Sequence, residues 1–227
     1  MLQGSFLLAF GRVVAVGLIL SFSFIACPSR TPKKEEKGPS TASTPAPAPT
    51  PSVNPEEARQ RLQAMGFEFT EKAFLDAARL GKTEAVELFL QAGMSPHVVN
   101  PQGRTALILA AQGGYLLVVQ KLIRAGADVN ARDRDGGTAL IWAAWGGYMP
   151  VVAELIRAKA DVNARDNVGN TALIWAASNG RTDVVRALIA AGADVNAANL
   201  QGKTALQLAM QNGYTPIVQI LTAAGAR

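Results

Sequence analysis

The stretch "TALIWAAWGGY", residues 138–148, opens with a threonine that returns at a fixed interval along the chain. Threonines occupy positions 105, 138, 171 and 204, each 33 residues after the last, with Gly two residues before and "AL" directly after. Glycines at 114, 147, 180 and 213 keep the same interval. A fixed period of this length indicates a stacked array, in which no single unit can bury its apolar face alone.

The residues of each unit predict two short helices. Thr105 can begin the first helix by accepting a hydrogen bond from a backbone N–H two or three residues later. Leu107, Ala110 and Ala111 follow on one narrow apolar stripe. A glycine pair or Asn-Gly then ends this helix. In the second helix Pro150 stands in the first turn, where a missing N–H costs nothing.

These units resemble the ankyrin repeat. The resemblance lies in the closing "AGADVN" and in the helix openings "GRTALILAA", "GGTALIWAA", "GNTALIWAA" and "GKTALQLAM". It implies an all-α solenoid of about five helix-turn-helix repeats within an ankyrin repeat domain at 70–227. The implied repeats are about 70–102, 103–135, 136–168, 169–201 and 202–227.

The N-terminal end of the array differs from the other units. A copy over 72–100 stays in register through Gly81 but lacks the threonine opening, so we expect it to be a capping repeat. Ahead of it, Asn54 and Pro55 are typical of a helix start. We therefore predict one capping helix within 55–69 that packs on the first repeat.

The units also depart from the ankyrin pattern. The usual Pro after Thr is Ala in all four copies, and the usual His is replaced by Ile108, Ile141, Ile174 and Gln207. The polar Thr-to-His link between repeats cannot form, so we expect apolar contact between the isoleucines in its place. Lys159 stands where the other units have glycine, and we expect its backbone to be left-handed.

The first 54 residues have a different composition from the array. Residues 13–26, "VVAVGLILSFSFIA", form an apolar run that ends at Cys27, the chain's only cysteine. The run is shorter than the about 20 residues of a bilayer-spanning helix and is typical of a secretory signal. The ending "FIAC" resembles a bacterial lipoprotein signal, which implies that Cys27 carries lipid.

We therefore predict a lipoprotein-type signal peptide at 1–27 and a Pro/Ala/Thr/Ser-rich disordered linker at 28–54. An uncleaved hydrophobic anchor is the alternative. Either interpretation predicts membrane tethering in the bacterial cell envelope, facing the periplasm or the exterior.

The charge pattern argues against nucleic-acid binding. The whole chain carries a net charge of +5, but residues 55–227 hold 17 basic and 15 acidic side chains. These charges are mixed along the sequence, whereas a nucleic-acid binder concentrates basic residues in a patch or stripe. We expect no nucleic-acid partner.

No catalytic or metal motif is complete. The "GKT" at 81–83 and at 202–204 lacks the earlier glycine of a phosphate-binding loop. His97 is the only histidine, too few for a multi-histidine metal site. We interpret Asp133 and Asp135 as solvated loop charge. We expect no enzyme activity, no cofactor and no metal.

The ankyrin resemblance implies a non-catalytic protein–protein interaction module. Such arrays bind through loop tips and the concave face of the first helices, and we expect this one to bind a protein partner as a monomer. The candidate tip positions are Gln102, Arg104, Arg134, Asp135, Asn167, Asn170, Gln201 and Lys203. The candidate concave positions are Gln112, Trp145, Ser178 and Gln211. Trp145 with Arg134 is the favoured pair, because Trp and Arg dominate binding hot spots.

Two other functions stay open. One is a structural or scaffolding envelope lipoprotein without a single partner. The other is an accessory protein or inhibitor of a periplasmic enzyme.

The period separates two neighbouring tryptophans. Trp142 recurs as Trp175, with leucine in the flanking units, so we predict that it is buried. Trp145 aligns with Gln112, Ser178 and Gln211 and has no aromatic counterpart. We therefore predict that Trp145 contacts a partner, with packing over Trp142 as the alternative.

Overall fold

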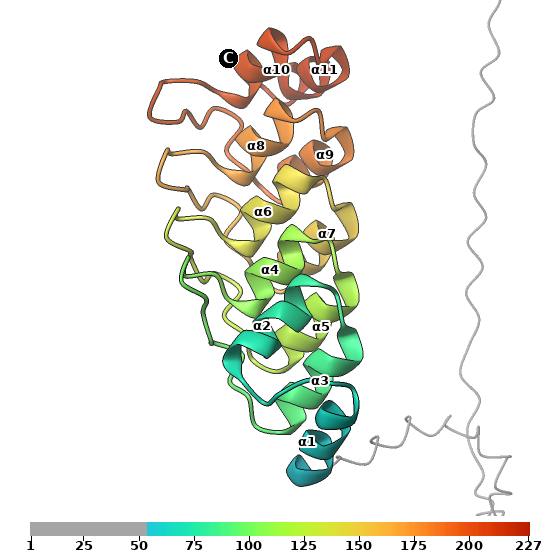
Figure 1. Cartoon of the computed structure of the whole chain (residues 1–227). Helices are drawn as coiled ribbons and strands as arrows, with labels where there is room; N and C mark the ends of the chain where they lie inside the picture. Colours follow the sequence, from blue (N-terminus) through green and yellow to red (C-terminus); the bar gives the residue numbers. More distant parts are fainter. Residues whose placement is uncertain (1–53) are drawn as a thin grey trace, which may run out of the picture. The chain divides into compact units, whose positions relative to one another are not determined.

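Residues 54–227 are the part of the chain that the computed structural model describes, and they form eleven helices and no strand (Figure 1). The predicted signal peptide, Cys27 and the linker up to residue 53 lie outside the described residues. Within residues 54–227, none of the helices combines the length and apolar character required to cross a membrane.

A single helix, α1 (Pro55–Ala64), is followed by five helix pairs. The first helices of the pairs are α2 (Glu71–Arg79), α4 (Ala106–Gln112), α6 (Ala139–Gly146), α8 (Ala172–Ser178) and α10 (Ala205–Gln211). The second helices are α3 (Thr83–Gln91), α5 (Leu116–Arg124), α7 (Met149–Arg157), α9 (Thr182–Ala190) and α11 (Thr215–Ala223). The predicted all-α repeat solenoid is confirmed.

Threonine side chains begin all five first helices. Thr105 Oγ1 accepts from the backbone N–H of Ile108 at 3.3 Å, and Thr138 and Thr171 make the same bond in the next two units. The first repeat was predicted to lack such a threonine, but Thr70 caps α2 from outside the repeat frame. As a result α2 starts two residues earlier than its counterparts.

Left-handed residues end the helices of each pair. Gly147 follows α6 with φ of 82°, as glycine tolerates. Lys159 takes the same role after α7 with φ of 66°, the only non-glycine residue of 54–227 with positive φ. The prediction of a left-handed Lys159 is confirmed.

The first helices form one row and the second helices another (Figure 1). Small alanines let the first helices approach one another more closely than the second helices do. Ile108, Ile141 and Ile174 lie in this row and are at most 3% exposed. Burying one isoleucine stabilises a fold by about 1.5–3 kcal/mol, so burial of these side chains takes the place of a polar link between repeats.

The closer packing of the first helices makes their side the concave side of the array. We call the surface formed by the first helices and the loops between repeats the inner face. Each loop also binds the next through the backbone, as where Asn167 N donates to Asp135 O at 2.9 Å. The inner face is therefore a continuous surface built from all five repeats.

The N-terminal end is closed by apolar side chains. Helix α1 packs against α3 and buries Ala58 and Leu62 completely. Phe89 on α3 lies at the centre of an aromatic group, with Phe74 at a ring distance of 5.7 Å and Phe67 at 6.0 Å. The predicted packing of an extra helix on the first repeat is confirmed.

Candidate functional site

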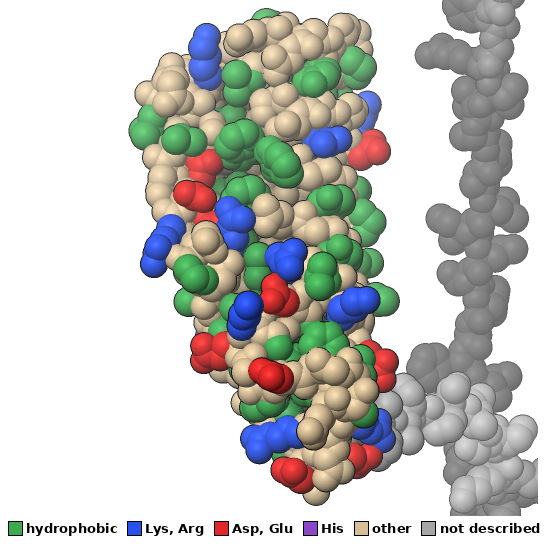
Figure 2. All heavy atoms as spheres, viewed as in Figure 1, with side chains coloured by type: hydrophobic (Ala, Val, Ile, Leu, Met, Phe, Trp, Pro, Cys, Tyr) green, Lys and Arg blue, Asp and Glu red, His purple; other side chains and the backbone are tan. Residues whose placement is uncertain are grey.

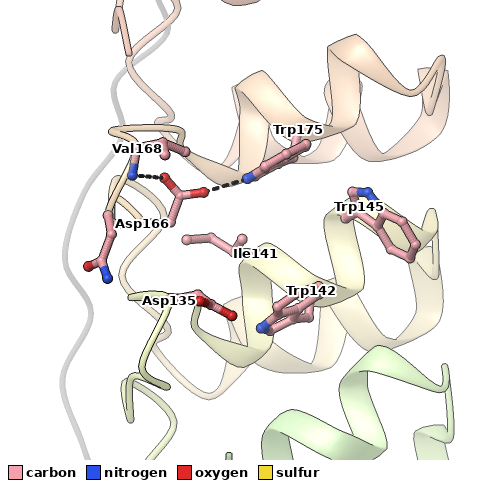
Figure 3. Close-up of a pocket in the computed structure, with 9 residues that line it drawn as sticks. Asp135, Ile141, Trp142, Trp145, Asp166, Val168 and Trp175 are labelled. Carbon is pink, nitrogen blue, oxygen red and sulfur yellow. Dashed lines mark hydrogen bonds between the residues drawn. The ribbon is translucent and has the colours of Figure 1, made fainter. Parts of the chain in front are cut away.

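The inner face is hollowed between α6 and α8. A cavity of about 400 Å³ lies there, beside the loops that precede the two helices (Figure 3). Figure 2 shows hydrophobic side chains gathered over α6 and α8, with acidic side chains beside them on the loop side. The lining residues are Asp135, Gly137, Ile141, Trp142, Trp145, Asp166, Asn167, Val168 and Trp175.

All three tryptophans of the chain line this cavity. The Trp145 ring meets Trp142 edge to face, with ring centres 6.2 Å apart and planes at 76°. Trp145 nevertheless stays 43% exposed. Trp145 thus packs on Trp142 and also presents a large aromatic surface to solvent.

Trp142 was predicted to be buried, and this prediction is wrong because the side chain is half-buried. Its indole N–H needs an acceptor, and Nε1 donates to Asp133 Oδ2 at 2.9 Å. This bond holds the ring at the loop edge of the inner face. The guanidinium of Arg104 lies 4.4 Å from the centre of the same ring, in range of a cation–π contact.

The tryptophan–aspartate pair is repeated in the next unit. Trp175 Nε1 donates to Asp166 Oδ2 at 2.7 Å, while Asp166 Oδ1 accepts from the backbone N–H groups of Val168 and Asn170. Asp133 Oδ1 accepts from the equivalent N–H groups one repeat earlier. The aspartate therefore shapes the loop with one oxygen and orients the tryptophan with the other.

Sequence reasoning missed this pairing, although the repeat frame contains a signal for it. Tryptophan stands nine residues after Asp133 and after Asp166, and leucine stands nine residues after Asn100 and after Asn199. Asn100 Oδ1 accepts the same two loop N–H groups, so asparagine suffices where no indole needs an acceptor.

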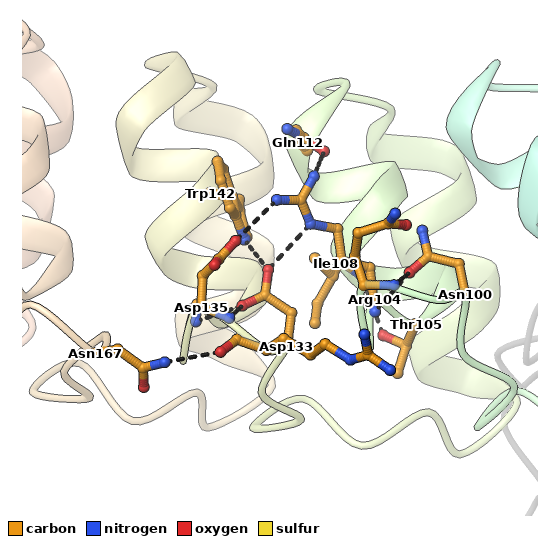
Figure 4. Close-up of polar contacts among 12 residues, drawn as sticks. Asn100, Arg104, Thr105, Ile108, Gln112, Asp133, Asp135, Trp142 and Asn167 are labelled. Atoms are coloured by element: carbon orange, nitrogen blue, oxygen red, sulfur yellow. Dashed lines mark hydrogen bonds and ion pairs between the residues drawn. The ribbon is translucent and has the colours of Figure 1, made fainter.

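Arg104 joins the second and third repeats through Asp133 (Figure 4). Its Nε lies 3.1 Å from Asp133 Oδ2, and its terminal nitrogens donate to Gln112 Oε1 at 3.3 Å and Asp135 Oδ2 at 3.5 Å. Asp133 was interpreted as solvated charge, but its side chain is fully buried. The Asp133 carboxylate can be buried because four N–H donors replace water around it.

The predicted contact residues are exposed, half-buried or buried, and only some of the exposed residues line the cavity. Trp145, Asp135 and Asn167 are exposed and line the cavity. Also exposed, but away from the cavity lining, are Gln102, Arg134, Gln201, Lys203 and Gln211. Half-buried are Arg104, Gln112 and Ser178.

Asn170 is the one predicted contact residue that is buried, and it is therefore unlike a loop-tip contact. Its Oδ1 accepts from Asn199 Nδ2 at 2.9 Å, so this side chain links the loop before α8 to the loop before α10. The favoured pair of Trp145 with Arg134 is not brought together at the cavity. Arg134 instead offers its backbone carbonyl to Asn167 Nδ2 at 2.7 Å, and Asp135 is the charged neighbour that the cavity contains.

The inner face carries no metal or nucleotide motif. Among residues 54–227, no group of three His, Cys, Asp or Glu side chains is placed to hold a metal ion. The "GKT" at 81–83 spans the turn from α2 into α3, and the "GKT" at 202–204 ends in Thr204, the cap of α10. Both segments thus serve the repeat fold.

Comparison with known proteins agrees with this architecture. A family model for ankyrin repeats, with three copies of the repeat, matches residues 74–166 and 147–227. A search of curated proteins gave no match to the chain. The two matched ranges cover more than half of the chain and coincide with the helix pairs of the array. The chain belongs to the ankyrin repeat family, whose arrays are protein–protein interaction modules.

Proposed function

We propose that the inner face binds one specific partner protein and that the cavity between α6 and α8 is the centre of this contact. The observation that carries the proposal is Trp145, a tryptophan 43% exposed at the edge of a cavity of about 400 Å³. Exposed tryptophan beside a concave apolar site is typical of a binding hot spot.

The surroundings of Trp145 favour a fixed contact surface. Trp142 packs against its ring, and Asp133 holds Trp142 in place. The opposite wall is held in the same way, by the bond from Trp175 to Asp166. A surface whose side chains are already fixed loses little entropy on binding, which favours recognition of a defined partner over loose adhesion.

We further propose that the array is tethered to a bacterial envelope membrane. Support comes from the sequence: an apolar run ends at Cys27, and a segment rich in proline, a residue that disfavours helices, follows it. Such a spacer extends by about 3.1 Å per residue. Acylated Cys27 would hold the array within reach of partners in the periplasm or at the cell surface.

Partner capture with the full chain in isolated membranes tests the recognition proposal. Wild type is expected to retain one protein in a fixed ratio, and Trp145→Ala to weaken that binding by about 30-fold or more, as for a hot-spot residue. Leu117→Ala is the matched control, because Leu117 is an exposed apolar side chain on the second-helix row. Equal capture by Trp145→Ala and wild type would contradict the proposal.

The same capture separates the other two functions. Recovery of wall material alone indicates a scaffold, and recovery of an enzyme whose activity changes on binding indicates an accessory protein or inhibitor. Tethering has a separate test in metabolic palmitate labelling of wild type and Cys27→Ser. We expect label only on wild type, whereas equal labelling would disprove acylation at Cys27.

A further inference from the structure

The residues that line the cavity include the equivalents, one repeat later, of Arg104 and of the residues that it contacts. Residue 137, the equivalent of Arg104 one repeat later, is glycine. Arg104 contacts four side chains, those of Asp133, Gln112, Asp135 and Trp142. Their equivalents 33 residues later are Asp166, Trp145, Val168 and Trp175.

Gly137 and all four of these equivalent residues line the cavity. The cavity between α6 and α8 is therefore the place that an arginine side chain fills one repeat earlier (Figures 3 and 4). Residue 137 cannot supply that side chain with Trp142 in its present position, because a Cβ there would lie 2.6 Å from Trp142 Nε1. The space is open to a side chain from outside the array.

The charges around the cavity also match a cation. Asp133 pairs with Arg104 at 3.1 Å, whereas Asp166 makes no ion pair within residues 54–227. Two of the nine lining residues, Asp135 and Asp166, carry carboxylates and none is lysine or arginine. The Asp135 carboxylate lies 3.5 Å from a terminal nitrogen of Arg104 but is 74% exposed, so it can also attract a cation from solvent.

We propose that the cavity receives an arginine side chain of the partner protein. In the arrangement copied from Arg104, the guanidinium lies over the Trp175 ring and donates to Asp166 Oδ2, and Trp145 replaces Gln112 as the outer wall. Arginine fits better than lysine because its planar guanidinium can stack on an indole and donate in its plane at the same time. This inference rests on the proposed function, since it supplies the chemistry of the partner.

The experiment is calorimetric titration of the full chain with short blocked peptides. The probe is acetyl-Gly-Arg-Gly-amide, and the controls carry citrulline, a neutral side chain of the same shape, or lysine in place of arginine. We expect the arginine peptide to bind at least about tenfold more tightly than the citrulline peptide, because citrulline lacks the charge that the ring and the carboxylate attract. The lysine peptide is expected to bind more weakly than the arginine peptide.

The matched variant combines Asp166→Asn with Trp175→Leu. It copies the Asn199/Leu208 pair at the junction of the fourth and fifth repeats, so the fold already accepts this pair at the equivalent place. We expect the variant to keep the helical circular dichroism of wild type and to lose the preference for arginine over citrulline. Binding of the arginine peptide that is unchanged by the variant would overturn the proposal.

Other outcomes are equally decisive. Free arginine that binds more tightly than the arginine peptide would identify a small-molecule site and overturn a protein contact. If arginine and citrulline peptides bind alike while Trp145→Ala abolishes partner capture, the arginine site fails and the proposed function stands. If the arginine peptide is preferred but Trp145→Ala leaves capture intact, the site stands and the proposed function fails.

Discussion

The junction between the second and third repeats and the junction between the third and fourth have the same aspartate–tryptophan pair but different contents. In the first, Arg104 fills the space over Trp142 and neutralises Asp133. In the second, Gly137 leaves the space over Trp175 open, and a cavity of about 400 Å³ results. The difference teaches that one residue of the repeat frame decides whether an inner-face position is filled by a side chain that joins the repeats or is left as a cavity open to solvent.

The largest expected effect on stability comes from removing Asp133, the aspartate at the junction that Arg104 fills. Asp133→Ala leaves Arg104 Nε and three other N–H groups without their acceptor. Breaking such a buried pair costs about 3–5 kcal/mol in free energy of unfolding, measured by urea denaturation. Asp166→Ala removes no ion pair and is expected to cost about 1–3 kcal/mol. Equal losses would show that Arg104 adds nothing at its junction.

Removing the arginine is expected to have an intermediate effect. Arg104→Ala should lower the free energy of unfolding by about 2 kcal/mol, because Asp133 keeps its N–H donors but loses its counter-charge. Lys203→Ala is the control at the equivalent position of the last repeat, where the side chain is exposed, and should change stability by less than about 0.5 kcal/mol. Similar values for the two variants would contradict the bridging role of Arg104.

A third variant changes the third repeat without touching either junction. Lys159→Gly relieves a left-handed backbone, φ of 66°, and should raise the free energy of unfolding by about 1 kcal/mol. Gly192→Lys is the reciprocal control, since Gly192 takes φ of 88° with open space around it, and should lower stability by a similar amount. A melting temperature that stays the same or falls in Lys159→Gly would argue against backbone strain at this site.

The smallest effect is the coupling between Arg104 and Trp142. A double-mutant cycle with Arg104→Ala and Trp142→Leu should give about 0.5–1 kcal/mol for the cation–π contact. Leucine is already present at this position as Leu109 and Leu208. The same cycle with Trp175→Leu should give almost no coupling, because Trp175 is one repeat away from Arg104. Coupling of equal size in both cycles would remove the distinction between the two junctions.

The fold was predictable because its determinants recur at one interval. Thr105 and its equivalents begin helices, Gly147 and its equivalents end them, and the alanines after each threonine pack the first helices. Each of these roles depends on residues within one helix turn. Thr70 was missed because it caps α2 from a position outside the frame.

The site was only partly predictable, because its parts come from different repeats. The exposure of Trp145 was predictable because its position lacks an aromatic counterpart in the other units. The burial of Asp133 depends on Arg104, 29 residues earlier, and on Trp142, nine residues later. The local sequence around Asp133 indicates only a charged loop. The bond between aspartate and tryptophan could have been predicted only by comparing the units that have Asp and Trp nine residues apart with the units that have Asn and Leu at the same positions.

The grouping of all three tryptophans at one cavity has a consequence for how this protein can be observed. Its intrinsic fluorescence comes almost entirely from the third and fourth repeats, whereas circular dichroism reports helices along the whole array. In a linear array each repeat contacts only its neighbours, so the ends can unfold before the middle. Any difference between the fluorescence and dichroism transitions would therefore measure how cooperatively the five repeats unfold.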